Sequence, residues 1–351
     1  MTTTEEQTGT HSAVTPRESV PRALLRNPTM VTFAALLAIV AAFSVLAPGV
    51  FTQSSNFVQL AQNVAILTVV SVGTTFVIIT AGVDLSIPSG IVLGEVFAVR
   101  ALQLVGTGNG TTAADVEANQ TRPWYILVAL AGALLAGLLV GTLNGVVVAY
   151  LKVPPLLATL GSLGAGLGFA LILQNGVNKA TYALDPVGHG TLIPGLPNLI
   201  PIALLVVAAG FVLLHLAVFG RHTYAIGSNP EAARRAGINV ERHLLKVYLL
   251  GGLSAGFAGF LSLSYFSTTS IGGHSTDNLQ AITAVALGGT SLFGGVGSII
   301  GTLIGVWIPA VLKNGFVITG VQPYWQDVAV GLVLIVAVWV DQLRRRSRDR
   351  G

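Results

Sequence analysis

The chain has no cysteine, which excludes disulfide bonds, thiol nucleophiles and thiolate metal sites. Charged residues are also scarce: they make up 9% of the 351 residues, against 52% for hydrophobic residues. A soluble globular domain carries about 25% charged residues, because its surface must face water. The composition therefore predicts a protein that spends most of its length inside a lipid bilayer.

Sequence signatures of catalysis are missing as well. No Gly-x-x-x-x-Gly-Lys-[Ser/Thr] run occurs, so the chain has no P-loop with which to hydrolyse a nucleotide. No His-Glu-x-x-His zinc motif occurs, and His189, His274 and Asp277 are not spaced as metal ligands. We therefore expect a chain that is not an enzyme and that binds neither a metal nor a cofactor itself.

Long apolar runs dominate what is present. A helix needs about 20 apolar residues to cross a membrane, and the sequence predicts about ten crossings in an all-α polytopic protein. The predicted crossings are 30–47, 57–80, 84–105, 124–150, 155–175, 198–218, 246–266, 281–294, 297–316 and 326–341. The run 281–294 is short, so it either crosses or re-enters the membrane.

The distribution of positive charge predicts the orientation. With the N-terminus inside, these crossings place every lysine and arginine on the inner side except Arg100, Arg122, Lys179 and Lys313. Positive residues are retained on the cytoplasmic side of membrane helices, so we expect both termini in the cytoplasm. The same reasoning assigns the pI of about 9.6 to membrane orientation rather than to a nucleic-acid partner.

Three regions follow from this pattern. Residues 1–29 are rich in Ser, Thr, Glu and Pro and lack an apolar signal-peptide core, which predicts a disordered cytoplasmic tail. Residues 30–341 form a single transmembrane domain. Residues 342–351 form a basic cytoplasmic C-terminus.

A polar segment at 219–245 interrupts the apolar pattern. Asn229 is a good N-cap, Pro230 suits the first helical position, and Gly237 offers a left-handed stop. We expect a two-turn helix that docks into a partner, although a basic loop that only fixes topology is the alternative. The expected docking residues are Gly227, Ser228, Asn229, Pro230, Glu231, Ala232, Ala233, Arg234 and Gly237.

One glycine pattern occurs twice. The run 137–146 recurs as 297–306, and each run is a small-xxx-small ridge that lets two helices approach closely. The ridge residues are Gly137, Gly141 and Gly145 in the first copy, and Gly297, Gly301 and Gly305 in the second. Because the predicted topology runs the two copies in opposite directions, the sequence predicts an inverted repeat, unless the match arises by chance.

An interrupted apolar span precedes each ridge, at 79–90 and at 284–297. Broken helices near the midplane, in corresponding positions of two halves, indicate a translocation site. The expected pathway residues are Asp84, Ser86 and Pro88 in the first span, and Thr290, Ser291 and Phe293 in the second. Asp84 is alternatively a helix cap at the membrane edge, and Phe293 is either a gate or a packing residue. Glu95 lies inside a predicted crossing, so it is functional or makes a buried hydrogen bond.

Several motifs together resemble the permeases of bacterial ABC monosaccharide importers of the ribose, xylose, arabinose and galactose type. They are Gly220-Arg221, the run 225–233 with Gly237-Ile238, the run 83–86, the run 288–295, and Gly297-Ser298 with Gly301-Thr302.

The resemblance implies a multi-pass protein of the bacterial cytoplasmic (inner) membrane, in which 227–237 is the coupling helix. It also implies a second permease subunit, a cytoplasmic ABC ATPase that uses ATP and Mg, and an external sugar-binding protein.

Pro88 departs from the family pattern, which has glycine there, so the implied role of this segment is less secure. ABC permeases for nucleosides or branched-chain amino acids share a related layout and remain alternatives. An ion-coupled secondary transporter, with Asp84 and Glu95 carrying protons, is a third possibility, although such a carrier has no ATPase for segment 219–245 to dock.

Overall fold

The structure, a computed structural model, describes residues 28–105 and 124–348; the predicted tail 1–29 lies almost wholly outside the described residues. The elements are α2 (Pro28–Leu46), α3 (Ser54–Ile79), α4 (Ile87–Leu104), α6 (Trp124–Ala149), α7 (Pro155–Gln174), α8 (Asp185–Gly188), α9 (Leu199–Phe211), the π-helical turn η1 (Val212–Leu216), α10 (Val218–Ser228), α11 (Pro230–Arg235), α12 (Val240–Phe266), α13 (Asp277–Leu287), α14 (Ile299–Ile318) and α15 (Pro323–Arg348).

Eight helices in the described ranges are long and apolar enough to cross a membrane: α2, α3, α4, α6, α7, α9 with η1, α12 and α14. The predicted all-α polytopic class is therefore confirmed. α15 contains the predicted crossing 326–341 but is not one of the eight.

Two predicted crossings differ from the structure. The helix expected over 84–105 begins at Ile87, because residues 80–86 are irregular. The crossing expected over 281–294 is wrong as a continuous helix, since α13 has 11 residues and ends at Leu287. At 1.5 Å per residue such a helix is about 17 Å long, well short of a bilayer core. It ends because Gly289 adopts φ 87° while the Thr290 N–H donates to the Val285 carbonyl, the geometry of a Schellman stop.

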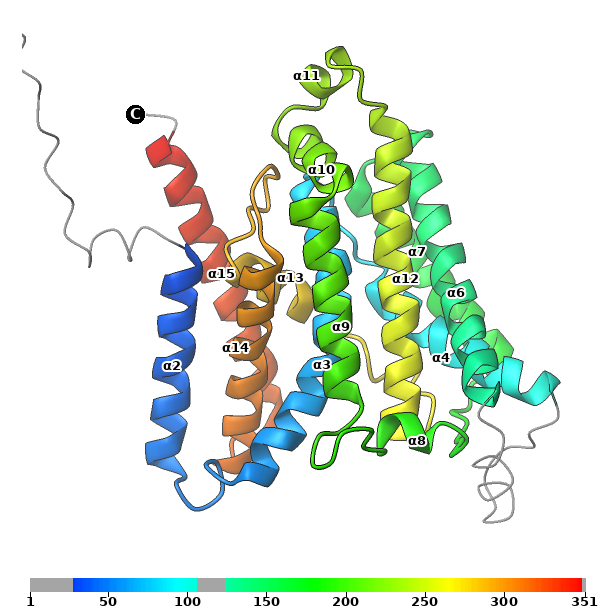
Figure 1. Cartoon of the computed structure of the whole chain (residues 1–351), viewed down its shortest axis with the longest axis vertical. Coiled ribbons are helices and arrows are strands. Elements are labelled where there is room, and N and C mark those ends of the chain that lie inside the picture. Colours follow the sequence, from blue (N-terminus) through cyan, green and yellow to red (C-terminus); the bar gives the residue numbers. More distant parts are fainter. Residues whose placement is uncertain (1–27, 106–123, 349–351) are drawn as a thin grey trace, which may run out of the picture.

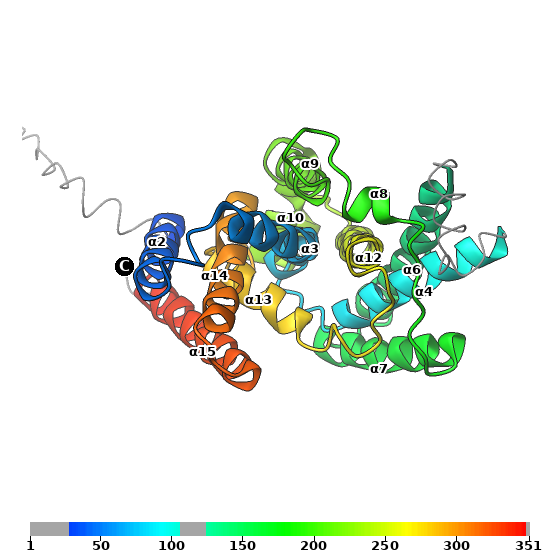
Figure 2. The same cartoon turned by 90° about the horizontal axis from the view of Figure 1, so that it is seen from below.

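The helices define two ends of the molecule (Figure 1). The start of α2 and the end of α15 lie at the same end as α11, as the predicted topology requires. The short helix α8 lies at the opposite end. From below, α12 lies between α3 and α6, while α2, α14 and α15 gather on one side (Figure 2).

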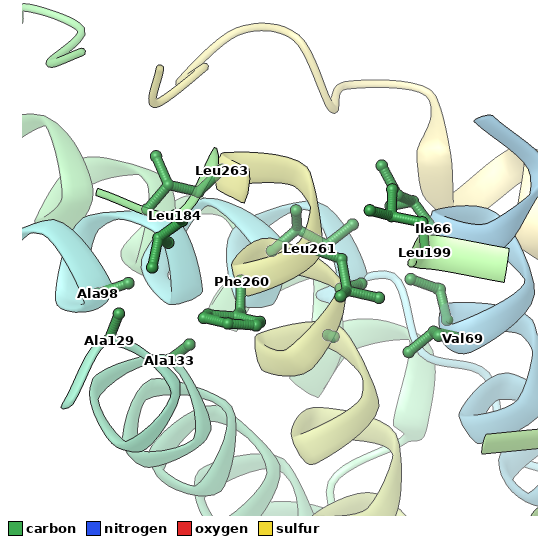
Figure 3. Packing of buried hydrophobic residues seen from close by; sticks show 14 of the residues in the cluster. Ile66, Val69, Ala98, Ala129, Ala133, Leu184, Leu199, Phe260, Leu261 and Leu263 are labelled. Atoms are coloured by element: carbon green, nitrogen blue, oxygen red, sulfur yellow. The ribbon is translucent and has the colours of Figure 1, made fainter. Parts of the chain in front are cut away.

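The largest hydrophobic cluster of the described residues surrounds the C-terminal half of α12. Phe260 and Leu261 are buried there among Ala98 of α4, Ala133 of α6 and Val69 of α3 (Figure 3). The small alanines bring the helix backbones close to the large side chains of α12. This cluster fixes the position of α4 and so of the irregular segment that precedes it.

Both predicted glycine ridges are close-approach surfaces. A Cβ at Gly137 would clash with the carbonyl oxygen of Gly252, and one at Gly141 would lie 2.7 Å from that of Tyr248. A Cβ at Gly145 would lie 2.6 Å from the side chain of Leu245. The first ridge therefore packs along α12, and no larger residue fits there without moving the helices apart.

The second ridge packs mainly on α13. A Cβ at Gly301 would clash with the carbonyl oxygen of Gly288, and one at Gly305 with that of Ala284. Gly297 precedes the helix and faces Ile79 and Thr290, each 2.7 Å from its Cβ position.

The inverted repeat stays a prediction, but the element order changes which breaks correspond. The first half runs α3, irregular residues 80–86, α4 and α6. The second half runs α12, irregular residues 267–276, α13 and α14. The counterpart of 80–86 in this order is 267–276, not the 284–297 span that the sequence pattern paired with it.

Candidate site where a capped helix meets two irregular segments

Segment 219–245 folds as predicted at its capped centre. The Asn229 side-chain oxygen accepts a hydrogen bond from the Ala232 N–H at 3.0 Å. At the other end Gly237 adopts φ 84°, and the Ile238 N–H donates to the Ala233 carbonyl at 3.1 Å. Both caps that the sequence predicted for this two-turn helix are therefore confirmed. The helix α10, on its N-terminal side, was not foreseen.

Ion pairs hold the capped helix against the start of α12. The Arg234 guanidinium lies 2.6 Å from Glu231 and 2.8 Å from Glu241, and Glu241 also pairs with Lys152 at 2.7 Å. Arginine is always charged in proteins, and the hydrogen bond to Glu241 raises the pKa of Arg234 further. Exposed pairs of this kind contribute little stability singly, but here they connect three separate segments.

Most of the expected docking residues face solvent. Those exposed are Ser228, Asn229, Pro230, Glu231, Ala232, Arg234 and Gly237. Ala233 is buried instead, in a small cluster with Ile226 and Val240 that seats α11 on its neighbours. Gly227 is buried as well and faces the transmembrane helices.

Gly227 lies where the two irregular segments meet. A Cβ at Gly227 would clash with the carbonyl oxygen of Ile79, the last residue of α3, and would lie 2.7 Å from the Gly295 nitrogen. The Gly295 N–H itself donates to the Ile79 carbonyl at 2.8 Å. On the same helix the Tyr224 hydroxyl donates to the Gly297 carbonyl at 2.7 Å. α10 therefore contacts segment 288–298 directly, and it reaches segment 80–86 through Ile79, the residue that precedes that segment. Because α10 leads into the capped helix α11, it connects this helix to both irregular segments.

Asp84 is buried inside the protein. It is 4% exposed, and its Oδ1 accepts from the Ser86 N–H at 2.8 Å and from the Ser86 hydroxyl at 2.6 Å. Pro88 occupies the first turn of α4, where it costs no hydrogen bond. The carboxylate therefore stabilises the irregular turn that leads into α4.

A buried polar network continues from this turn into α6 and α7. The Asn144 amide donates to the Ser86 hydroxyl at 2.7 Å, and the Ser162 hydroxyl donates to the Asn144 side-chain oxygen at 2.6 Å. The sequence analysis missed Asn144 and Ser162. The only signal for Asn144 was a polar side chain within the otherwise apolar first ridge.

Segment 288–298 carries the other predicted pathway residues. Thr290 is 2% exposed, and its hydroxyl has no hydrogen-bond partner within the described part of the chain. The Ser291 N–H donates to the Val296 carbonyl at 3.0 Å, which closes the loop on itself. Phe293 is 40% exposed, so it is not a core packing residue.

The two irregular segments meet through apolar side chains. Val83 and Leu85 of the first segment pack with Leu292 of the second around the buried residues Ile78 and Val285. Asp84 bonds instead to Ser86, and the Ser86 hydroxyl accepts from Asn144 of α6. The structure thus brings the predicted pathway segments together, but it separates the polar side chains of Asp84 and Ser86 from Thr290.

A second buried polar cluster lies toward the other end of α4. One oxygen of Glu95 accepts from the Ser262 hydroxyl at 2.8 Å and lies 3.0 Å from His274 Nε2; the other accepts from the Ser270 N–H at 2.7 Å. His274 Nδ1 lies 2.7 Å from Asp277. Glu95 therefore makes the buried hydrogen bonds that were one of its two expected roles. His274 and Asp277 were not predicted to join Glu95, because they are far from it in sequence. No group of described residues has the arrangement of a metal site.

A family model described as the permease component of branched-chain amino acid transport systems matches residues 56–338. The chain belongs to this permease family. The matched range contains segments 80–86, 219–245 and 288–298, so all the geometry above lies in the part shared with the family.

Curated relatives align along almost their full length. The ribose import permease RbsC of Escherichia coli K12 is 36% identical, covering 89% of this chain and 92% of the relative. The fructose import permease FrcC of Rhizobium meliloti is 32% identical, and the alignment covers 91% of this chain and 87% of the relative. The xylose transport permease XylH of Escherichia coli K12 is 30% identical, and the alignment covers 92% of this chain and 93% of the relative. No solved structure shows a significant match to this permease.

Proposed function

We propose that this permease is the transmembrane subunit of an ATP-driven importer that translocates a monosaccharide or a related polyol. The observation that carries the proposal is the position of Gly227, because it links an exposed, doubly capped helix to both irregular segments of the transmembrane core. The substrate class follows from relatives whose names specify ribose, fructose and xylose.

The sequence has no P-loop, so we assign hydrolysis of ATP with Mg to a cytoplasmic ABC ATPase. The exposed residues of α11, with Glu231 and Arg234 at their centre, are the surface that docks there. This places α11 and both termini in the cytoplasm and the chain in the bacterial inner membrane. An external sugar-binding protein and a second permease subunit complete the importer.

Movement of α11 reaches the core through α10. A displacement of Gly227 shifts the Ile79 carbonyl and the Gly295 N–H that it touches, and with them the ends of the two irregular segments. The apolar cluster against which Leu85 and Leu292 both pack then separates and opens a path past Ser86 and Thr290. Irregular backbone at membrane depth, used in this way, is typical of transporters that alternate access.

Two other functions have an observation in their favour. The description of the matched family favours an amino acid as substrate. Buried carboxylates such as Asp84 and Glu95 would suit a proton-coupled carrier, but hydrogen bonds hold both carboxylates in their folded turns. A carrier also has no use for the exposed capped helix.

Uptake measurements distinguish these functions. The permease is co-expressed with the ATPase and binding protein encoded beside it, in cells without other sugar importers, and given labelled ribose, xylose, fructose, leucine or adenosine. We expect accumulation of a sugar, and loss of accumulation when the P-loop lysine of the ATPase is replaced. Accumulation of leucine or adenosine alone, or uptake that persists without a functional ATPase, would show the proposal to be wrong.

A further inference from the structure

We infer that the outer half of this permease contains a binding site for a neutral polyhydroxylated solute, in a cavity between α3, α13 and α14. The cavity has a volume of about 420 Å³. Its walls come largely from the first half of α3 and the last turns of α14, which lie toward the end opposite α11 (Figure 1). Its polar lining is formed by Gln59, Asn63, His274, Asp277, Gln280, Lys313 and Asn314. The inference rests on the proposed function, since it identifies where the transported solute first binds the permease.

The polar groups converge from three helices. Gln59 and Asn63 are four residues apart on α3, and Asp277 and Gln280 are three apart on α13, so each pair shares one helix face. Lys313 and Asn314 approach from the last turns of α14. Because the three helices are distant in sequence, this convergence is a property of the fold rather than of one polar stretch.

Several of these groups are unsatisfied in the protein. Gln59, Asn63 and Lys313 lie on helices long and apolar enough to span the membrane, yet none has a hydrogen bond or an ion pair to any described residue. A polar group that faces hydrocarbon without a partner costs several kcal/mol, so such groups face water or a polar solute. These three side chains face the cavity.

The lining matches the chemistry of a sugar. Amide side chains both donate and accept hydrogen bonds, as the hydroxyl groups of a polyol do. Leu60, Val64, Leu67 and Val70 give the cavity an apolar wall for the C–H face of a sugar ring. Charges of both signs line the cavity, because Lys313 and the protonated His274 lie there with Asp277, and this mixture disfavours a solute that carries net charge of either sign. The volume lies within the range of about 300–1,000 Å³ typical of small-molecule sites.

The cavity also leads toward the irregular segments. Asp277 lines it, and the next residue, Asn278, is buried with its amide 3.5 Å from the carbonyl of Leu85. His274, which also lines the cavity, is held by Glu95 of α4. A solute bound here therefore lies beside Asp277, whose neighbour Asn278 contacts segment 80–86. It is on the outer side of the apolar cluster of Leu85 and Leu292, which must open.

The absence of native cysteine allows a direct test. Asn63→Cys in the assembled importer is treated with a membrane-impermeant thiol reagent, with and without whichever of ribose, xylose or fructose the wild-type importer takes up. We expect rapid labelling that this sugar slows several-fold. Gln62→Cys is the matched control, because Gln62 is the adjacent amide on α3 and does not line the cavity; its labelling should not respond to sugar.

Transport kinetics give a second readout. Gln59→Leu and Asn63→Leu should each raise the KM for that sugar by about 2–10-fold, the effect of one lost hydrogen bond, while ATPase activity of the importer stays at the wild-type level. Gln62→Leu should leave the KM unchanged.

The inference is overturned if Asn63→Cys is not labelled, as when lipid fills the cavity, or if it forms disulfide-linked permease dimers, as when a second copy covers it. It is also overturned if labelling ignores the sugar and the KM values stay at the wild-type level. These outcomes are distinct from failure of the proposed function, in which the wild-type importer takes up no sugar at all.

Discussion

Gly227 lies directly against the carbonyl oxygen of Ile79, so close that the position has no room for a Cβ atom. Gly295 donates a hydrogen bond to the same carbonyl at 2.8 Å. Three segments distant in sequence thus meet at one carbonyl oxygen, at the boundary between the capped helix and the transmembrane core. This junction connects the surface proposed for the ATPase with the segments proposed for the substrate.

Gly227→Ala is expected to damage this junction. The added methyl group must displace Ile79 or the 288–298 loop, and overpacking of this kind costs about 1–3 kcal/mol. Uptake per ATP hydrolysed should fall, as measured by parallel uptake and ATPase assays in proteoliposomes. Gly164→Ala is the control, because a Cβ there meets nothing within 4 Å. Equal loss of coupling in both variants would contradict a specific role for Gly227.

Asn229→Ala should loosen the capped helix without unfolding the protein. Removal of an N-cap costs about 1 kcal/mol, which corresponds to roughly fivefold faster local opening. Hydrogen exchange of residues 230–236 should therefore speed up by about that factor, while exchange in α12 is unchanged. Asn229→Asp keeps an acceptor oxygen and should behave as the wild type.

Glu231→Arg tests the docking surface itself. The Glu231 side chain is 73% exposed, and its pair with Arg234 contributes little to stability, so folding and membrane insertion should be normal. Reversal of the charge places a cation against whatever surface α11 meets, and uptake should fall well below that of Glu231→Gln. Wild-type uptake by the Arg variant would exclude Glu231 from the interface.

Asp84→Asn distinguishes an ATP-driven importer from a proton-coupled carrier. Asparagine keeps the oxygen that accepts from the Ser86 N–H and hydroxyl, and it loses only the charge assistance, which is worth about 1.5–3 kcal/mol per bond at most. We expect reduced but ATP-dependent uptake that ignores an imposed pH gradient. Asp84→Leu, which removes both hydrogen bonds, should abolish uptake. Complete loss in the Asn variant, with wild-type uptake driven by the pH gradient alone, would favour a carrier.

Local chemistry explains what the sequence predicted well. The caps at Asn229 and Gly237 depend on neighbours within a few residues, so composition and spacing were enough to predict them. A glycine stop at Gly289 would likewise have predicted the observed end of α13. Hydropathy stays high across Gly288 and Gly289, however, and for this reason 281–294 was predicted to be one crossing. That error was avoidable from the sequence.

Tertiary contacts explain what the sequence could not predict. Asn144 meets Ser86 across 58 residues, and His274 meets Glu95 across 179, so neither pair has a local pattern. Five of the six predicted pathway residues lie on irregular segments and Pro88 lies in the first turn of α4, but the direction of each side chain depends on helix packing. For the same reason the amides on α3 gave no sign of the cavity that α13 and α14 complete.

The cluster of Glu95, His274 and Asp277 predicts a pH dependence of stability. Burial lowers the pKa of His274, but hydrogen bonds to Asp277 and Glu95 outweigh burial and raise it to about 10, from 6.5 in an unfolded chain. The folded state therefore binds the proton more tightly, and the stability gained is fully present below about pH 6.5 and lost as the pH rises through about 10. The unfolding temperature in detergent should fall across this range, and more steeply in the wild type than in His274→Gln, which has no proton to lose.

His189→Gln is the control, because the His189 side chain is 54% exposed and lies 3.6 Å from its only carboxylate partner in the described residues. Identical pH profiles for the wild type and His274→Gln would show that His274 is neutral in the folded protein.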